Sequence, residues 1–464
     1  MKQVSAILAT ALLFCGALGA QAAVELVSPA DGETVPLLTE PQKAYVKLPL
    51  AERRVLFADE EFRRKKMGLP TAMKRRADWP QVVELVWKVK KDTACSVTVR
   101  DTKKGTVVFS SVVSNETACV DNLEIAATYE WTVDDGEGPV RRIFKTEDMA
   151  PRLVRFPGVG NVRDIGGWKG LDGRRIRQGL VFRSAGLNQN ASPTYYKFEE
   201  LEAAGKMSVY EKQRTKIADR LKRVEGWRRD HSLIKREGKK DWEYIDYERW
   251  LKQHPDDSLD AYLDGRIAAL KTNLETKAFM KIEKKDLIPG KSLVAGEKGE
   301  YIRSRFGIKT DIDLRWAKEC YGMTGSPLGP TVAWHMYPSW PYGGVTGKQG
   351  SAAFKQVFTL FLDEKNYPIV FHCIAGQDRT GTDAYILEAL LGVDEDTLAL
   401  DWELSGLNNR SAGFNHKERY DGLVAAVNKN FPAPTVRERA EKFVLSLGFT
   451  EADIAKFRAI MLEP

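Results

Sequence analysis

A cysteine and an arginine six positions apart carry the strongest chemical signal in the chain. Cys373 and Arg379 stand between an apolar stretch at 367–371 and an amphipathic stretch at 380–391. The first stretch predicts a short buried strand, and the second predicts a helix. A loop this short aims several backbone N–H groups at one point, and the new helix adds the positive end of its dipole. The sequence therefore predicts an anion site beside Cys373.

The residue types in this loop suit a phosphoryl group. A thiolate is a competent nucleophile, and the loop amides, the helix N-terminus and Arg379 would all stabilise the ionised form of Cys373. The planar fork of Arg379 matches two oxygens of a phosphoryl group, which a lysine could not do. The other residues that we expect to bind substrate at this loop are Ile374, Ala375, Gly376, Gln377 and Thr380.

The stretch from His372 to Thr380 resembles the His-Cys-x5-Arg-Thr motif of the cysteine-based protein tyrosine phosphatase superfamily. The resemblance implies that Cys373 attacks phosphorus and that Arg379 clamps the phosphoryl oxygens, with no cofactor and no metal. We expect His372 to orient the loop through its backbone rather than to act as a base. The alternative is a buried, inert cysteine at a strand end, but that alternative does not require Gly376 or Arg379.

Three further segments resemble a bacterial branch of this superfamily. The branch has an Asn-Phe-Arg-Asp-x-Gly-Gly opening, an Arg-Ser strand and an Asp-Leu-Arg strand, and here Val162 replaces the aromatic residue of the opening. The resemblance covers 150–464 apart from one long insertion, and it implies an α/β domain with a partly parallel sheet. Arg163 is a candidate for substrate contact, with a structural ion pair as the alternative. The matching segments are Asn161–Gly167, Arg183–Ser184 and Asp313–Arg315.

The general acid is the part of the resemblance that the chain does not reproduce. Family members usually supply an aspartate from a mobile loop upstream of the cysteine, but the corresponding region at 334–344 contains no aspartate or glutamate. Asp378, inside the loop, and Asp313, at a predicted strand end, are the two candidates to replace it. The alternative for Asp378 is to stiffen the loop, and the alternative for Asp313 is a salt bridge with Arg315.

Three functions are compatible with these residues. The first is a secreted phosphomonoesterase that acts on phosphotyrosine-type substrates through a phosphocysteine intermediate. The second keeps this chemistry for an inositol phosphate or phosphoinositide, since the Asp-Arg-Thr ending at Asp378 resembles phosphatases of that kind and secreted bacterial phosphatases of broad specificity. The third is a non-catalytic phosphate-binding surface protein that retains the loop.

Composition favours a folded protein of several domains. The chain has 464 residues, of which 43% are hydrophobic and 29% charged, and its formal net charge is +7. One core is unlikely to organise a chain of this length. No interleaved aromatic and basic residues indicate nucleic acid binding, and the five scattered histidines predict no metal site. Cys95 and Cys119 could pair after export or remain two core thiols.

The first 22 residues have the features of a secretory signal peptide. Lys2 precedes an apolar run from Val4 to Leu18, and Ala20-Gln21-Ala22 provides a small-residue cleavage site. We therefore expect export to the periplasm or outside the cell, and no later stretch is long and apolar enough to span a membrane.

The rest of the chain divides into two predicted domains. Residues 24–148 alternate apolar and polar residues in short runs and resemble a fibronectin type III module, whose partner the sequence does not identify. A basic, partly helical segment at 40–79 interrupts this pattern. Residues 149–464 form the predicted tyrosine-phosphatase-like catalytic domain. Within it, a charged insertion at 190–298 has helical patterning at 210–227 and 262–279, and it predicts either a cap over the substrate or a solvated helical lid.

Overall fold

The computed structural model describes residues 24–58, 79–89, 93–236, 250, 256–407 and 419–464. The chain divides into two compact units. The first contains 1–190, 291–317 and 323–464, and the second contains 191–290 and 318–322. The predicted signal peptide lies outside the described residues.

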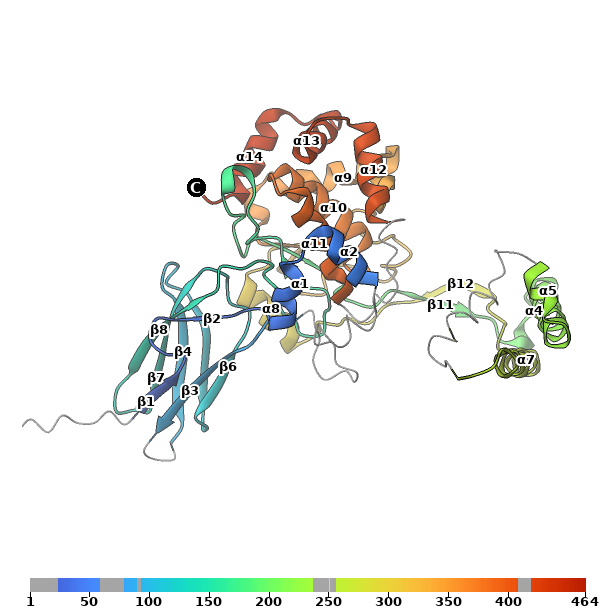
Figure 1. The fold of residues 1–464 in the computed structure, drawn as a ribbon, viewed down its shortest axis with the longest axis horizontal. Coiled ribbons are helices and arrows are strands. Elements are labelled where there is room, and N and C mark those ends of the chain that lie inside the picture. Colours follow the sequence, from blue (N-terminus) through green and yellow to red (C-terminus); the bar gives the residue numbers. More distant parts are fainter. Residues whose placement is uncertain (1–23, 59–78, 90–92, 237–249, 251–255, 408–418) are drawn as a thin grey trace, which may run out of the picture. The chain divides into compact units, whose positions relative to one another are not determined.

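The strands between Val24 and Thr146 form two sheets around one hydrophobic core (Figure 1). Buried and exposed residues alternate along β3 and β4, as expected for strands with one face in a core. Trp87 from one sheet and Trp131 from the other are both fully buried in that core, so this region is a β-sandwich. The first sheet has the order β1 (Val24–Ser28), β3 (Val83–Val89), β6 (Thr117–Val120), and the second has the order β2 (Glu33–Val35), β8 (Val140–Thr146), β7 (Thr128–Asp134), β4 (Cys95–Asp101), β5 (Val107–Val113).

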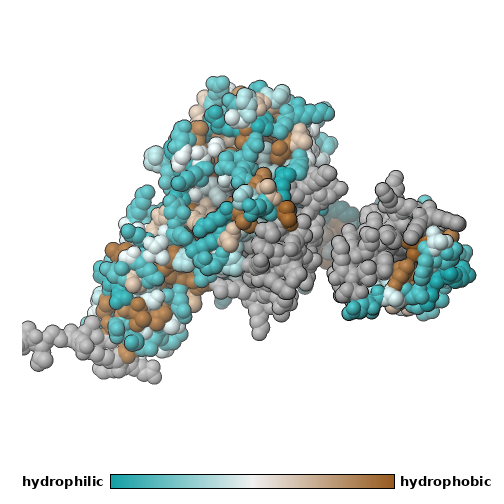
Figure 2. Space-filling view, in the orientation of Figure 1, coloured by the Kyte–Doolittle hydropathy of each residue, from teal (hydrophilic) through white to brown (hydrophobic). Residues whose placement is uncertain are grey.

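The surface and the cysteines of the sandwich do not identify a partner. Val112 and Ile143 are among its exposed apolar side chains, and Figure 2 shows hydrophobic residues on its visible face. Scattered exposure of this kind is ordinary for a protein surface. Cys95 is buried and Cys119 is exposed, and neither forms a disulfide.

Two helices between β2 and β3 pack on the predicted catalytic domain, 149–464, instead of the sandwich. They are α1 (Glu40–Val46) and α2 (Leu50–Ala58). Tyr45 joins the main hydrophobic core of the catalytic domain, and its hydroxyl lies 3.2 Å from a carboxylate oxygen of Glu403. Arg53 is buried and donates to the same carboxylate at 2.8 Å. The predicted limits of 24–148 therefore describe the sandwich strands, whereas 40–58 pack with the catalytic domain.

The catalytic domain is built on a five-stranded sheet. Its central strand runs parallel to both neighbours, and only the edge strand β9 is antiparallel. The register aligns Ser184, His372 and Asp313 at the C-terminal ends of three adjacent strands, which is where open α/β sheets form their sites. The strand order is β14 (Ala333–Met336), β13 (Thr310–Asp313), β15 (Ile369–His372), β10 (Val181–Ser184), β9 (Arg163–Asp164).

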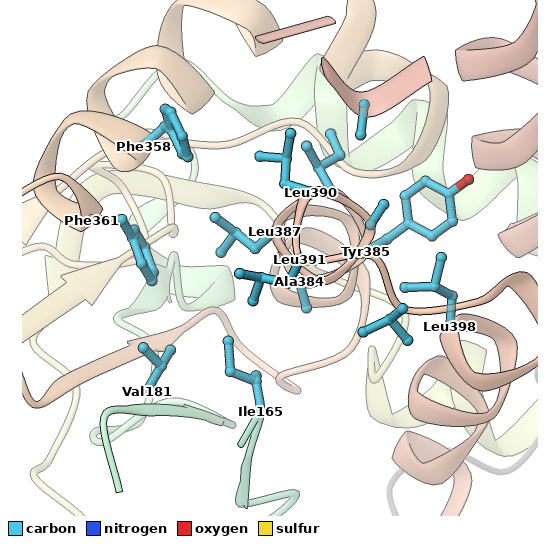
Figure 3. Close-up of a cluster of buried hydrophobic side chains, with 14 of the residues drawn as sticks. Ile165, Val181, Phe358, Phe361, Ala384, Tyr385, Leu387, Leu390, Leu391 and Leu398 are labelled. Carbon is cyan, nitrogen blue, oxygen red and sulfur yellow. The ribbon is translucent and has the colours of Figure 1, made fainter. Parts of the chain in front are cut away.

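The helix that follows β15 lies in the interior of the catalytic domain. In α10 (Asp378–Leu390) every residue after Asp378 is buried, and a helix buried on all sides belongs in a core. Figure 3 shows side chains of this helix directed outward on several sides, with Phe358 and Phe361 of α9 nearby and Ile165 and Val181 below. The loop before α10 is therefore anchored at both ends by buried elements.

The remaining helices of the first unit complete this core. Asp394 caps α11 by accepting from the amides of Asp396 and Thr397, and Thr435 and Thr450 form capping boxes at the starts of α13 and α14. The other helices are α8 (Glu297–Phe306), α9 (Lys348–Phe361), α11 (Glu395–Leu404), α12 (Tyr420–Asn430), α13 (Val436–Ser446) and α14 (Glu451–Met461). Across the described ranges, the short 3-10 helices are η1 (Leu171–Gly173), η2 (Phe198–Glu200), η3 (Tyr342–Thr346), η4 (Glu364–Asn366) and η5 (Ser405–Leu407).

The described residues of the second unit form a two-stranded ribbon and helices with their own apolar cores. Trp227, Tyr262 and Leu270 are buried between its helices. Its elements are β11 (Ser192–Tyr195), α4 (Met207–Arg229), α5 (Ser232–Arg236), α7 (Leu259–Thr276) and β12 (Glu283–Ile288). Residues 191–290 of the predicted insertion at 190–298 belong to this unit, and helices are present at both stretches with predicted helical patterning. Among the described residues, no helix has the length and apolar character needed to cross a bilayer.

Candidate active site

The loop between β15 and α10 has a conformation that only glycine permits at one position. Cys373 follows the end of β15 and is almost completely buried. Gly376 has a φ of +69°, and a Cβ atom there would lie 2.4 Å from the carbonyl oxygen of Ser184. Any larger residue would therefore push the loop away from β10. The loop can turn back on itself directly beside the Cys373 sulfur because residue 376 is glycine.

The carbonyl groups of the loop are held on its outer side. The carbonyl of Ile374 accepts from the amide of Gly186 at 3.1 Å, and that of Ala375 accepts from the side chain of Asn161 at 2.9 Å. The Gly376 carbonyl accepts from the Arg183 guanidinium at 3.0 Å. The N–H of a trans peptide points opposite to its C=O, so the following amides face the inside of the loop. In the described part of the chain, the amides of residues 374–377 have no acceptor, which leaves them available to an anion.

The side chains at the start of α10 add donors to this nest of amides. Arg379 is 7% exposed, and its guanidinium lies 3.4 Å from the carbonyl of Leu314. The hydroxyl of Thr380 and the side-chain amide nitrogen Nε2 of Gln377 are buried without a hydrogen-bond partner among the described residues. Buried polar groups normally have partners, so unpartnered ones beside an amide nest indicate a site for a polar ligand.

His372 is a buried side chain next to Cys373 that contacts a carboxylate and the loop backbone. Its Nε2 lies 3.0 Å from Asp311, and its Nδ1 lies 3.3 Å from the Cys373 carbonyl oxygen. Burial lowers the pKa of His372, but the negative charges of Asp313 and Asp311 outweigh burial and raise that pKa overall. These contacts hold the His372 ring against Asp311 and the Cys373 backbone, a geometry that suits a residue that orients the loop.

Asp313 does not have the properties of a general acid. It is fully buried and pairs with the Arg315 guanidinium at 2.6 Å. Burial raises the pKa of Asp313, but His372 and Arg315 together lower it to about 2. The carboxyl group therefore has no proton to give near neutral pH, and the expectation that Asp313 could supply one is wrong. The alternative prediction, a salt bridge with Arg315, describes the geometry.

Asp378 is at the mouth of the loop and has a different environment. It is the first residue of α10, and its side chain is 36% exposed. Its Oδ1 accepts from the hydroxyl of Tyr342, and the Arg419 guanidinium lies 3.3 Å from the same oxygen. No hydrogen bond in the described part of the structure occupies Oδ2. This second oxygen is therefore available for proton transfer.

Arg163 lies beneath the loop and does not face a substrate. Its guanidinium donates to the Asp401 carboxylate at 2.7 Å and to the Asn161 side chain at 2.6 Å. Arg183 pairs with the same carboxylate while it holds the Gly376 carbonyl. Burial raises the pKa of Asp401, but the two arginines outweigh burial and lower it. The expectation of substrate contact by Arg163 is thus corrected to a structural ion pair that supports the loop.

Sequence reasoning did not identify Asp401, Tyr342 or Arg419 as parts of the site. Asp401 had a detectable signal, because it interrupts an apolar stretch from Leu398 to Leu404 that forms a buried helix. A charged residue in such a stretch needs a buried partner of opposite charge. Tyr342 and Arg419 had no signal of this kind, since their relation to Asp378 depends entirely on tertiary contacts.

Comparison with known proteins relates these residues to one family. Residues 154–204 and 292–463 match the family described as the tyrosine phosphatase family. The gap between the two matched segments corresponds closely to the second compact unit. No match was found among curated proteins. Among the described residues, no three His, Cys, Asp or Glu side chains are grouped so that they could hold a metal ion.

Proposed function

We propose that this chain, whose residues 154–204 and 292–463 match the tyrosine phosphatase family, hydrolyses phosphomonoesters with Cys373 as the nucleophile. The observation that carries the proposal is the nest of inward-facing amides at residues 374–377, in the loop between Cys373 and Arg379. Such a nest stabilises the charge that develops on phosphoryl oxygens in the transition state.

The proposed reaction has two steps. The Cys373 thiolate attacks phosphorus, the bond between phosphorus and the ester oxygen breaks, and that oxygen takes a proton from Oδ2 of Asp378. Water then attacks the phosphocysteine, the S–P bond breaks, and the Asp378 carboxylate accepts the proton from the water. Arg379 binds two phosphoryl oxygens throughout. Inorganic phosphate leaves, and the thiolate is regenerated.

An aromatic phosphate is the substrate class that the surroundings of the loop favour. Ile374, within the loop, is 40% exposed. Trp316 is 41% exposed and packs on Trp340 with ring centroids 4.8 Å apart. The Leu314 carbonyl approaches the Arg379 guanidinium and also accepts from the Ser339 amide. Trp316 is two residues after Leu314 and Trp340 directly follows Ser339, so both tryptophans are close in sequence to this contact. An apolar flank of this kind suits a phenyl ring better than a polyol, so we propose phosphotyrosine-type substrates.

The alternative substrate is an inositol phosphate or phosphoinositide. Arg419 places a cation near the mouth of the loop, and Gln377 has an unpartnered donor within it. These groups could bind a second phosphate or a ring hydroxyl. A non-catalytic phosphate-binding surface protein is the third candidate, and it would retain the nest without turnover.

Substrate comparison tests these candidates. We expect the purified protein, assayed with EDTA, to hydrolyse a phosphotyrosine peptide faster than an inositol phosphate. Trp316→Ala should lower kcat/KM for the peptide by about tenfold, on the order of an aromatic contact, and change the inositol phosphate rate little. Ile143→Ala on the sandwich is a matched control, since Ile143 is equally exposed at 41%. Faster hydrolysis of inositol phosphate would favour the alternative, and binding without turnover would favour the third candidate.

We propose export with cleavage after Ala22, so that mass spectrometry of the exported protein should find Ala23 as the first residue. We retain the fibronectin type III-like assignment for the sandwich and the cap assignment for the insertion. Replacement of 191–290 by a short linker should change the ratio of rates on different substrates, and an unchanged ratio would contradict a cap.

A further inference from the structure

We propose that Tyr342 positions Asp378 for proton transfer, together with Arg419, in place of the upstream acidic loop that this chain lacks. This role rests on the proposed function, because it assumes that Asp378 exchanges protons with substrate and water. The region at 334–344 contains no carboxylate, yet it contacts the only catalytic candidate at the mouth of the loop through the Tyr342 hydroxyl. The region at 334–344 would therefore orient the acid, and α10 would supply the acid itself, Asp378.

The backbone at Tyr342 is fixed in an unusual conformation. Its φ is +55°, in the left-handed region that residues other than glycine rarely adopt. Its amide donates to the Thr382 hydroxyl at 2.8 Å, and that hydroxyl donates to the Asp378 carbonyl at 2.8 Å. Tyr342 is therefore attached to the first turn of α10 through its backbone as well as its side chain. Conformations of this kind persist where surrounding contacts enforce them, and they are frequent at functional sites.

The Tyr342 hydroxyl can only be a donor at this position. Burial and the negative charge of Asp378 raise the pKa of Tyr342 far above its ordinary range. The phenol thus remains protonated at any pH at which the protein works, and its proton points to Oδ1 of Asp378. Arg419 is a permanent donor toward the same oxygen. Since Oδ1 always accepts, a proton carried by Asp378 must be on Oδ2.

This asymmetry gives Asp378 one proton-carrying oxygen in a fixed direction. A carboxyl group without such partners can rotate and can hold its proton on either oxygen. General acid catalysis depends on the acid being within hydrogen-bond reach of the leaving oxygen. In the part of the chain that the structure describes, the charged and titratable groups around Asp378 are Tyr342 and Arg419 in contact, Arg379 next in sequence and Cys373 in the same loop. Asp383 faces Ser339 instead.

The test compares Tyr342→Phe with Asp378→Asn on two substrates. Tyr342→Phe removes one oxygen and keeps the ring, and Tyr337→Phe is a matched control because Tyr337 is in the same region but faces His335 at 3.4 Å. For a phosphate ester with a poor leaving group, Tyr342→Phe should lower kcat/KM by about tenfold to a hundredfold, the range for a hydrogen bond to a charged group. For an activated aryl phosphate the loss should be small, because that leaving group needs little protonation.

The pH profile separates positioning from a merely structural role. In Tyr342→Phe the basic limb of the kcat/KM profile should move to higher pH, since a donor that stabilises the ionised carboxylate has been removed. Tyr342→Phe should also cause no additional loss in an Asp378→Asn background. Arg419→Gln should shift the limb in the same direction, and it provides a second measurement if Tyr342→Phe folds poorly.

Two contrary results would have different meanings. A wild-type profile in Tyr342→Phe, combined with a loss in Asp378→Asn that depends on the leaving group, would overturn the role of Tyr342 and leave the proposed reaction intact. An equal loss on both substrates in Asp378→Asn would overturn the acid itself, and the positioning role with it.

Discussion

Aspartate and arginine side chains have opposite roles on the two sides of the loop between β15 and α10. We call the side with Asp378 the mouth of the loop, and the buried side with Asp401 its base. At the mouth, Asp378 is 36% exposed and has hydrogen bonds to one of its two oxygens. At the base, Asp401 is buried, and both of its oxygens accept from arginines. A carboxylate between two buried arginines keeps its charge and stabilises the fold. A partly exposed carboxylate with hydrogen bonds to only one oxygen can exchange a proton through the other. Environment, rather than residue type, divides the roles.

The arginines differ in the same manner. Arg163 and Arg183 are committed to Asp401 beneath the loop. Arg379 is in the first turn of α10, with its guanidinium 3.4 Å from the Leu314 carbonyl, and we propose that it binds an anion inside the nest. We therefore expect substitutions at the mouth to reduce rate with little effect on folding, and substitutions at the base to reduce stability first.

Arg379→Lys should give the largest effect on rate. Lysine keeps the charge but loses the fork that binds two oxygens, so kcat/KM should fall by about 10³-fold to 10⁵-fold, as for arginines that stabilise phosphoryl transfer. The melting temperature should change little. Arg54→Lys is a control, because Arg54 makes an exposed ion pair with Asp421 at 2.7 Å. A loss of less than about tenfold in Arg379→Lys would contradict the assigned clamp.

Asp401→Asn should give the largest effect on stability. It leaves two buried arginines without their shared counter-charge, which should cost about 3–5 kcal/mol of folding free energy. Chemical denaturation measures this directly. Asp421→Asn removes the acid of the exposed Arg54 pair and should cost at most about 1 kcal/mol. An equal loss of unfolding free energy in Asp401→Asn and Asp421→Asn would contradict the proposed difference between the buried ion pairs beneath the loop and the exposed pair.

Asp383→Asn tests a buried carboxyl group that has no cation beside it. Asp383 is fully buried and accepts from the Ser339 hydroxyl at 3.2 Å, and burial raises its pKa to about 7. Because the Asp383 pKa is higher in the folded protein than its unfolded value near 3.8, the protonated carboxyl group contributes fully to stability below pH 3.8. This contribution is lost as pH rises through about 7. The loss should approach about 3–4 kcal/mol. Asp383→Asn should flatten the pH dependence of unfolding between pH 4 and 8, and an unchanged slope would contradict the buried, protonated state.

Asp378→Ala should give a smaller and more selective effect. It should slow hydrolysis of esters with poor leaving groups by about a hundredfold, while activated aryl phosphates lose much less. Stability should stay close to that of the wild type, because Asp378 is at the surface. An equal loss of rate on both kinds of substrate would mean that Asp378 has a structural role, like Asp401, and is not the proton donor.

Much of the catalytic domain could be predicted from sequence because its signals are local. The strand before Cys373, the helix after it, the Asp394 cap and the final helix at 451–461 all follow from short-range patterns. The requirement for Gly376 could be inferred from the motif, and its physical reason is the close approach to Ser184.

What could not be predicted depends on contacts between distant segments. Arg163 meets Asp401, which is 238 residues away, and Arg53 meets Glu403 across 350 residues. The sequence therefore left two alternatives for Arg163, substrate contact and a structural ion pair, and it placed the segment at 40–58 within the predicted limits of the sandwich region, 24–148. Tyr342 likewise has no local signal, because a single tyrosine beside two glycines has many possible roles.

The most direct test of the central claim compares the mature protein with Cys373→Ser, both assayed with EDTA. Phosphotyrosine peptide and an activated aryl phosphate are the substrates, and mass spectrometry of acid-quenched protein searches for a phosphate on Cys373. We predict turnover by the wild-type protein, a covalent phosphate at Cys373, and loss of turnover in Cys373→Ser with unchanged folding. Turnover that persists in Cys373→Ser would contradict the proposed mechanism.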